Sequence, residues 1–309
     1  MKQIAILTGM TATGKSEVAL EFAAARGDIE LINADSVQVF RRMDIGSAKP
    51  SAEEQARVRH HLLDIRNPDE PFSAGGFRRA VDECLTDIEC RGKRALIVGG
   101  TGFYLKALLY GMWQAEEADP TERERFRDSL AETRSEDLLA RIAEKDPVTA
   151  KRLPASDRYR LVRALEVMHF TGKTPTELED SMPTEPDPRF TLLVLDRPKE
   201  ELEQRIEKRT REMLRLGFLE EVQKLLRDFH TSRALQAVGY AQVVAHIEGR
   251  LPAGRKSALT EENLVAEISL ATRQLCKRQR TWFRSEKNTK MFELEKDRAA
   301  LLTALAEIY

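Results

Sequence analysis

The chain has 309 residues, which suits one large domain or a core with an inserted segment. Charged residues make up 33%, yet the formal net charge of −1 excludes a uniformly basic nucleic-acid-binding protein, so any basic face must be local. The three cysteines lack metal-ligand spacing, which argues against a zinc site or disulfide framework and for the cytoplasm. The apolar run Ile4–Leu7 is too short for a signal peptide, and no run approaches about 18 apolar residues, so we expect no membrane partner.

The first hundred residues alternate short β-branched runs with helical patterns. The runs predict strands at Gln3–Leu7, Ile29–Asn33 and Arg94–Gly100. The helical patterns predict helices from about Lys15 to Ala25 and from Ser73 to Arg91. This order is typical of an α/β fold with a mainly parallel sheet flanked by helices.

The pattern changes between residues 116 and 188, where charge is dense and no strong strand pattern occurs. We predict a helical insertion domain at 116–188, between core segments 1–115 and 189–309. Phe190–Asp196 then predicts a return to the sheet. A long helix is expected from Pro198 to about Phe229, and the remainder is expected to be helical.

A phosphate-binding loop is predicted between the first strand and the first helix. The sequence there matches G-x-x-x-x-G-K-[ST], and its position confirms the match. Backbone amides and the helix N-terminus would surround an anion, Lys15 would add a full charge, and Ser16 would offer a hydroxyl to Mg²⁺. We therefore predict a P-loop NTPase-like core that binds a phosphorylated ligand through Gly9, Met10, Thr11, Ala12, Thr13, Gly14, Lys15 and Ser16.

Polar residues follow the ends of two further strands, where ligands of parallel sheets bind. Asp35 and Ser36 come after the second strand and Thr101 after the third. Asp35 is therefore a candidate for chemistry at this edge, although an aspartate here also suits a helix N-cap. The third strand ends in glycines rather than in the Mg²⁺-linked aspartate of an NTPase, a role that Asp196 could fill instead.

Two arginine-rich helical segments have alternative interpretations. Arg205, Arg209 and Arg211 form one cluster, in which Arg205 and Arg209 share a helix face. The cluster either grips a pyrophosphate or pairs with neighbouring glutamates in solvent. The segment 273–290 either tracks RNA phosphates or forms a solvated helix whose aromatics pack inward. Its basic face consists of Arg273, Lys277, Arg280 and Arg284, with Trp282 and Phe283 interleaved.

Together these motifs resemble the bacterial tRNA dimethylallyltransferase family in order along nearly the whole chain. The matching segments are Gly9–Ser16, Asn33–Gln38, Met43–Pro50, His60–Ile65, Val98–Tyr104, Arg163–Val167, Val238–Tyr240 and Ala271–Leu275. The resemblance implies transfer of a dimethylallyl group from dimethylallyl pyrophosphate to the N6 amine of the adenosine next to the tRNA anticodon (tRNA position 37). It also implies release of pyrophosphate, Mg²⁺ as cofactor, and a cytoplasmic monomer whose partners are the tRNA anticodon loop and the donor.

The resemblance also implies roles for individual residues. The phosphate loop would bind the donor's pyrophosphate rather than ATP, Asp35 would accept the amine proton, Thr101 would hydrogen-bond the bridging oxygen, and Arg209 would clamp the pyrophosphate. The implied tRNA contacts are Asp35, Ser36, Val37, Gln38, Thr101, Arg123, Tyr159, Arg160, Leu161, Val162, Arg163, Gln236, Ala237, Val238, Gly239, Tyr240 and Ala241. Three positions depart from the family pattern: Met10 stands where the family usually has a proline, and Gln236 and Ala241 stand where some family members have basic residues.

Three alternatives remain at this level. An isopentenyltransferase acting on free AMP or ADP would share the loop and Asp35 but lack the helical insertion. A small-molecule kinase or NTPase would hydrolyse ATP or transfer phosphate. A non-catalytic RNA-binding module is disfavoured by the intact set of Lys15, Ser16, Asp35, Thr101 and Arg209.

Overall fold

The computed structural model describes residues 3–113, 119–250, 259–287 and 289–309. The chain forms two compact units: a core unit of Met1–Leu109 with Pro186–Tyr309, and a helical unit of Tyr110–Glu185. The helical unit thus begins at Tyr110 rather than at residue 116 and ends at Glu185 rather than at 188.

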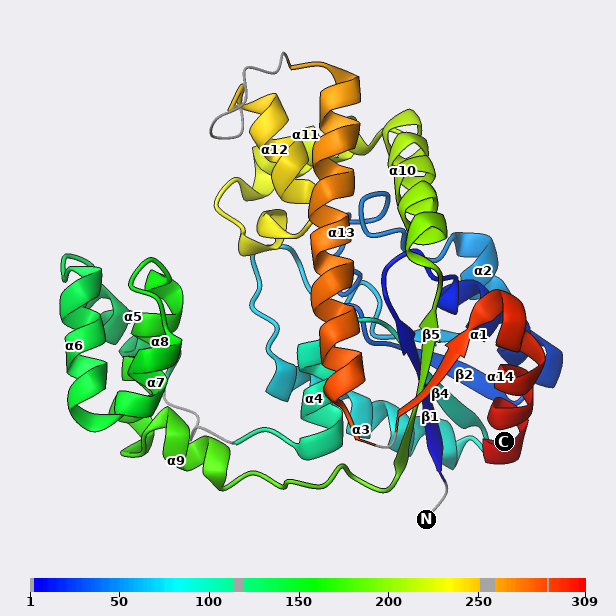
Figure 1. The fold of residues 1–309 in the computed structure, drawn as a ribbon, viewed down its shortest axis with the longest axis horizontal. Helices are drawn as coiled ribbons and strands as arrows, with labels where there is room; N and C mark the ends of the chain where they lie inside the picture. The colour runs from blue at the N-terminus through cyan, green and yellow to red at the C-terminus, as the bar shows by residue number, and fades with distance from the viewer. Residues whose placement is uncertain (1–2, 114–118, 251–258, 288) are drawn as a thin grey trace. The chain divides into compact units, whose positions relative to one another are not determined.

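The core unit contains a parallel sheet and the helices that cover it (Figure 1). Its strands are β1 (Ile4–Gly9), β2 (Ile29–Asn33), β3 (His60–His61), β4 (Arg94–Val98), β5 (Phe190–Asp196) and β6 (Thr289–Glu293). Its helices are α1 (Lys15–Arg26), α2 (Ala52–Arg57), α3 (Ala74–Cys90), α4 (Gly102–Tyr110), α10 (Lys199–Arg215), α11 (Phe218–Phe229), the 3₁₀ helix η1 (Arg233–Gln236), α12 (Tyr240–Ile247), α13 (Glu261–Ser285) and α14 (Leu294–Ile308).

All neighbouring strands pair in parallel, in the order β3-β2-β4-β1-β5-β6. β1 therefore lies inside the sheet, between β4 and β5, with Ile6 opposite Ile97 on one side and Leu192 on the other. Parallel strands end at the same edge, so the loops after β1, β2 and β4 are neighbours. The predicted parallel α/β fold is confirmed.

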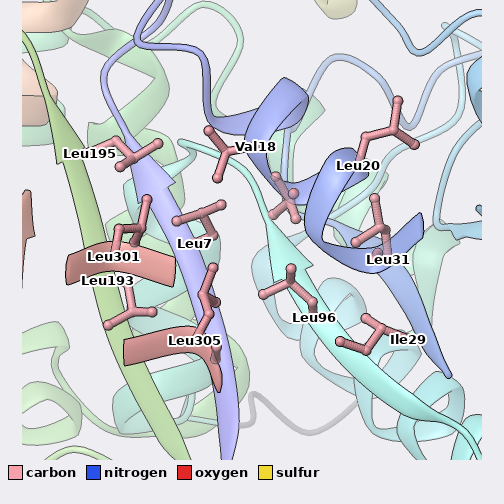
Figure 2. Packing of buried hydrophobic residues seen from close by; sticks show 14 of the residues in the cluster. Leu7, Val18, Leu20, Ile29, Leu31, Leu96, Leu193, Leu195, Leu301 and Leu305 are labelled. Carbon is pink, nitrogen blue, oxygen red and sulfur yellow. The ribbon is translucent and has the colours of Figure 1, made fainter. Parts of the chain in front are cut away.

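The sheet is buried on both faces, because side chains alternate along each strand. Figure 2 shows one face, where Leu7, Leu31 and Leu96 of three strands lie in a cluster with Val18 of α1 and Leu305 of α14. The alternating residues Ile6, Ile32 and Ile97 are fully buried on the opposite face. Burying an aliphatic side chain of this size stabilises the fold by about 1.5–3 kcal/mol, so the sheet is a rigid support for its loops.

A second apolar cluster joins α11, α12 and α13 to the loop around Met43. Phe218 and Tyr240 are fully buried there and pack edge to face, with ring centroids 5.0 Å apart. This packing fixes the loop after β2 against the C-terminal helices of the same unit.

The helical unit has its own small core. Its helices are α5 (Pro120–Ser129), α6 (Ser135–Lys145), α7 (Pro147–Arg152), α8 (Arg158–Thr171) and α9 (Pro175–Asp180). Leu138, Ile142 and Leu161 are fully buried between α6 and α8. A separate core of this kind supports the prediction of a helical insertion.

Two predictions about secondary structure are wrong. The helix expected from Pro198 to Phe229 is two helices, since the chain turns at Gly217, whose φ of 98° is unfavourable for other residues. The chain after residue 229 is not wholly helical either, because Thr289–Glu293 forms β6 at the sheet edge beside β5. Within the described residues, we find no helix long and apolar enough to cross a membrane.

Candidate active site at the phosphate-binding loop

The phosphate-binding loop connects β1 to α1 and is shaped by close backbone contacts. At Gly9, with φ of 150°, an added Cβ would lie 2.3 Å from the Leu195 carbonyl oxygen, so only glycine fits. The Thr13 hydroxyl donates a hydrogen bond to the Met10 carbonyl (2.9 Å) inside the loop. α1 begins directly at Lys15, and a helix start leaves its first amide groups without intrahelical partners. The loop thus presents amides and the positive end of the helix dipole to an anion.

Two arginines from the β5–α10 region fix the loop from outside. Arg205 donates from Nε to the Ala12 carbonyl (2.8 Å), and Arg197 donates from Nε to the Thr13 carbonyl (2.8 Å). Arg197 is buried and also pairs with Glu201. These hydrogen bonds hold the loop carbonyls from outside, which is the preorganisation that anion binding needs.

Two partly buried cations lie beside the loop without a counter-ion of their own. Within the described residues, the side chain of neither Lys15 nor Arg209 makes a hydrogen bond or an ion pair. Burial lowers the pKa of Lys15 below its ordinary 10.5; Asp35 opposes that shift and Arg209 adds to it. Burial likewise lowers the pKa of Arg209, again opposed by Asp35. Desolvated cations in this arrangement attract an anion more strongly than cations in bulk water do.

Asp35 is held at the end of β2 by the side chain of Asn33. The Asn33 Oδ1 accepts a hydrogen bond from the Asp35 amide (3.1 Å), and its Nδ2 donates to the Asp35 carbonyl (3.2 Å). One Asp35 carboxylate oxygen, Oδ1, accepts from the amides of Val37 (2.8 Å) and Gln38 (3.4 Å). The aspartate therefore caps a turn rather than a helix, and Oδ2 accepts no hydrogen bond from the described residues.

Thr101 connects the loop after β4 to the Asp35 loop. Its hydroxyl oxygen accepts from the Ser36 amide (2.9 Å) and donates to the Ser36 hydroxyl (3.3 Å). Gly99 allows this approach, because a Cβ there would lie 2.3 Å from the Ala34 carbonyl oxygen. The structure thus brings Asp35, Thr101, Lys15 and Arg209 together at one edge of the sheet.

A cavity of about 940 Å³ opens beside these cations. Its walls are the phosphate-binding loop, the segment after β2 and α10, and they include Lys15, Ser16, Ile45, Lys49, Arg209 and Met213. Lys15 and Arg209 therefore belong both to the cavity wall and to the electrostatic surroundings of Asp35. The mixture of cations and apolar side chains suits a ligand with an anionic head and an apolar tail.

The arginines of α10 divide between the two predicted roles. Arg211 pairs with Glu207 and Glu262 on the exposed surface, as the solvated alternative expected. Arg205 and Arg209 instead face the phosphate-binding loop, the first through a hydrogen bond and the second through charge.

The basic face of residues 273–290 is divided in the same way. Arg280 donates to the Asp196 carboxylate (2.6 Å), so Asp196 is engaged in an ion pair instead of facing the phosphate loop freely. Phe283 is fully buried, and Trp282 packs against Gly102. Lys277 and Arg284 remain exposed. The aromatics thus pack inward while only part of the basic set faces solvent.

The residues implied to contact tRNA differ widely in exposure. In the core unit, Gln236 is exposed, whereas Tyr240 is fully buried and donates its hydroxyl proton to Glu221 (2.7 Å). Tyr240 therefore supports the loop from inside. Val37, Ala237, Val238 and Ala241 are partly buried, and Gly239 is buried.

In the helical unit, the implied contacts lie at the start of α8 and on α5. Tyr159 (56% exposed) and Arg160 lie at the surface, while Leu161 is fully buried and Val162 partly so. Arg123 and Arg163 both pair with the buried carboxylate of Glu166, Arg163 at 2.9 Å. Leu161 is thus a core residue whose side chain cannot reach RNA in this structure.

Sequence reasoning missed the residues that hold the site together. Glu221 accepts hydrogen bonds from the amides of Asp44, Ile45 and Gly46, and Lys49 pairs with Asp44 and Asp64. No local sequence pattern marks these residues, because the burial of the Lys49 side chain (4% exposed) becomes visible only in the fold.

Comparison with known proteins places the whole chain in one family. A family model described as IPP transferase matches residues 38–286. The chain is 41% identical to a tRNA dimethylallyltransferase 1 of Trichlorobacter lovleyi, over 99% of each chain.

Solved structures agree with this match. A tRNA delta(2)-isopentenylpyrophosphate transferase from Staphylococcus epidermidis is 31% identical, with a TM-score of 0.69 over 100% of this chain and 99% of the other. A eukaryotic dimethylallyltransferase acting on tRNA shares the fold, with a TM-score of 0.82 at 24% identity over 99% and 78% of the two chains. The predicted P-loop NTPase-like α/β core is confirmed, and the chain belongs to the IPP transferase family.

Proposed function

We propose that the protein transfers a dimethylallyl group from dimethylallyl pyrophosphate to the N6 amine of adenosine 37 in tRNA and releases pyrophosphate. The observation that supports this most directly is the site's charge arrangement: two desolvated cations without counter-ions, beside an amide-lined loop, within electrostatic range of one carboxylate. An anionic leaving group and a proton acceptor are the two requirements of this reaction.

The diphosphate of the donor occupies the phosphate-binding loop. Lys15, Arg209 and the amides at the start of α1 stabilise the negative charge that grows on the departing pyrophosphate. The cavity beside them has room for the donor, with Ile45 and Met213 available to its apolar chain. Thr101 can hydrogen-bond the bridging oxygen once its hydroxyl proton turns away from Ser36.

Asp35 acts on the nucleophile. An adenine amine is weakly nucleophilic because its lone pair is delocalised into the ring, so removal of its proton during attack assists the reaction. Oδ2 of Asp35 is available for that proton, while Oδ1 keeps the carboxylate in place through the Val37 amide. The new N6–C1 bond forms as the C1–O bond to pyrophosphate breaks, and the proton goes to Asp35.

Mg²⁺ is the proposed cofactor, and Ser16 fits as its protein ligand. Ser16 is exposed on the cavity wall at the start of α1. Among the described residues there is no cluster of three or more carboxylate, histidine or cysteine side chains that could hold a metal ion. A site formed by protein ligands alone is therefore not expected here. Mg²⁺ accepts such sites, because it binds one or two protein oxygens together with phosphates and waters. When bound, it supplies charge neutralisation to the diphosphate.

The target base has to leave its stack to reach Asp35, and single-stranded loops present such bases readily. We propose the tRNA anticodon loop as the partner, with the exposed Tyr159 and Arg160 of the helical unit and Gln236 of the core unit among its contacts. The protein is further proposed to act as a monomer in the cytoplasm.

Mass analysis of tRNA nucleosides after incubation with dimethylallyl pyrophosphate and Mg²⁺ tests this function. We expect an adenosine carrying one added isopentenyl group. Asp35→Asn is expected to lower turnover by about 10²–10⁴-fold while tRNA binding persists. The control Asp69→Asn, an exposed aspartate outside the cavity, should leave turnover unchanged.

The alternatives predict other products from the same incubation. Modification of free AMP or ADP but not of tRNA would favour the small-molecule isopentenyltransferase, and ATP consumption without prenyl transfer would favour a kinase or NTPase. Normal turnover by Asp35→Asn would exclude the carboxylate as the base.

A further inference from the structure

One glutamine of α13 connects the two loops that carry the leaving-group contacts. Gln279 accepts a hydrogen bond at Oε1 from the Thr11 amide (3.1 Å) and donates from Nε2 to the Gly100 carbonyl (2.8 Å). Thr11 belongs to the phosphate-binding loop, and Gly100 directly precedes Thr101. The contacts span 268 and 179 residues of sequence, so they are entirely tertiary.

The two loops diverge where this glutamine lies. β1 and β4 pair up to Leu7 and Val98, and the Thr8 hydroxyl still reaches the Gly99 carbonyl (2.6 Å). Beyond that point the strands stop pairing, and Gln279 supplies the next link between them. Gln279 lies tightly against the Gly100 backbone, since a Cβ on Gly100 would lie 2.8 Å from the Gln279 Nε2.

The chemistry of the link requires an amide side chain. One backbone group is an N–H and the other a C=O, so the bridge needs one acceptor and one donor on a short fork. A glutamate would keep the bond to Thr11 but would set a carboxylate oxygen against the Gly100 carbonyl. A methionine has a similar length and shape but makes neither hydrogen bond.

The other contacts to the phosphate-binding loop act on that loop alone. Cys276, one turn earlier on α13, places its sulfur 3.7 Å from the Thr11 carbonyl, and Arg205 and Arg197 hold the next two carbonyls. Among these side chains, Gln279 is the one that also holds the Gly100 loop.

We propose that Gln279 is a positioning residue that fixes the separation between the phosphate-binding loop and Thr101. Its catalytic consequence rests on the proposed function, in which Thr101 meets the bridging oxygen of the diphosphate held by that loop. If the link is lost, the loop can still bind an anion, but the hydroxyl and the departing oxygen no longer meet at hydrogen-bonding distance.

The test compares Gln279→Met and Gln279→Glu with Gln274→Met, a change of an exposed glutamine on the same helix. For Gln279→Met we expect inorganic pyrophosphate, titrated by calorimetry, to bind about fivefold more weakly. That factor corresponds to the one hydrogen bond that Gln279 makes to the phosphate-binding loop. We expect kcat for prenyl transfer to tRNA to fall about tenfold, because small misplacements in an active site are costly. Gln279→Glu should be at least as impaired, and Gln274→Met should match the wild type.

A double-mutant cycle with Thr101→Ala separates positioning from a general loss of structure. If Gln279 acts through Thr101, the tenfold effect of Gln279→Met on kcat should shrink to about twofold or less in the Thr101→Ala background. An equal effect in both backgrounds would overturn the proposal, and so would wild-type kcat in Gln279→Met.

The two arms also separate this inference from the proposed function. If the wild type fails to prenylate tRNA, the proposed function is wrong. The role of Gln279 in linking the two loops is then tested by the pyrophosphate titration alone. Weaker pyrophosphate binding by Gln279→Met then supports it, and unchanged binding overturns it.

Discussion

Glu221 of α11 is the acceptor on which the cavity loop after β2 depends, and its removal gives a sharp stability prediction. Oε2 accepts from the amides of Asp44 (3.0 Å) and Ile45 (2.7 Å). Oε1 accepts from the Gly46 amide (3.2 Å) and from the Tyr240 hydroxyl (2.7 Å). All four donors point at one carboxylate, so a glutamine there must turn its own NH₂ group toward two of them.

The magnitude follows from these bonds. Glu221→Gln loses two charge-assisted hydrogen bonds, worth about 1.5–3 kcal/mol each, and leaves two donors unpaired. Because Glu221 is partly exposed, we take the low end and expect a loss of about 3 kcal/mol in the free energy of unfolding. Tyr240→Phe removes one donor and leaves the carboxylate intact, so it should cost about 1 kcal/mol.

Urea unfolding followed by tryptophan fluorescence measures these losses. The chain has two tryptophans, and Trp282 alone reports the core unit in a Trp113→Phe background. The exposed neighbour Glu220 provides a matched control, because Glu220→Gln should cost less than about 1 kcal/mol. A Glu221→Gln variant within about 0.5 kcal/mol of the wild type would refute the assignment of this carboxylate as the loop's support.

Three further predictions concern the charged groups. Because burial lowers the pKa of Lys15 below 10.5, its ammonium loses its proton at lower pH than a free lysine does, so pyrophosphate affinity should fall as pH rises through that lowered pKa. Calorimetry across pH should show this alkaline fall in the wild type and not in Lys15→Met. Arg209→Met should reduce the rise in melting temperature that saturating pyrophosphate causes, a stabilisation of about 2.7 kcal/mol at one hundred times Kd in the wild type; an undiminished rise would contradict the clamp. Glu166→Gln should destabilise the helical unit by about 3 kcal/mol, because three arginines lose a buried counter-charge. Unfolding followed by Trp113 fluorescence measures this loss, and an unchanged unfolding midpoint would contradict the prediction.

Local patterns were enough to predict the phosphate-binding loop and most of the sheet. Ile29–Asn33 and Phe190–Asp196 form strands with the predicted bounds, because both segments are mainly apolar, as buried parallel strands are. The loop is recognisable because its glycines and Lys15 act at fixed spacing along one stretch of chain. β6 could not be found in this way, since Thr289–Glu293 is a short edge strand with only Phe292 buried.

The supports of the site are not visible in any local pattern. Gln279 and Glu221 are single polar residues on amphipathic helices, and nothing at their own positions distinguishes them from solvated neighbours. Their contacts lie 268 and about 176 residues away in sequence, so only the tertiary fold assigns them. The same holds for Arg205 and Arg209: their spacing predicts a common face but not that one holds a carbonyl and the other stays unpaired.

On α10, Arg205 and Arg211 have partners within the protein while the Arg209 side chain has none, which leaves Arg209 available to an anion. If Arg209 had a neighbouring carboxylate, the diphosphate would have to break an ion pair before it could bind. Instead, the surrounding glutamates are engaged elsewhere: Glu207 and Glu262 hold Arg211, and Glu212 pairs with Arg215. Burial disfavours the charged forms of Arg209 and Lys15, and an arriving diphosphate relieves that penalty more fully than Asp35 alone does. Because negative charge on the diphosphate grows as it departs, the relief is greatest in the transition state, where it accelerates the reaction.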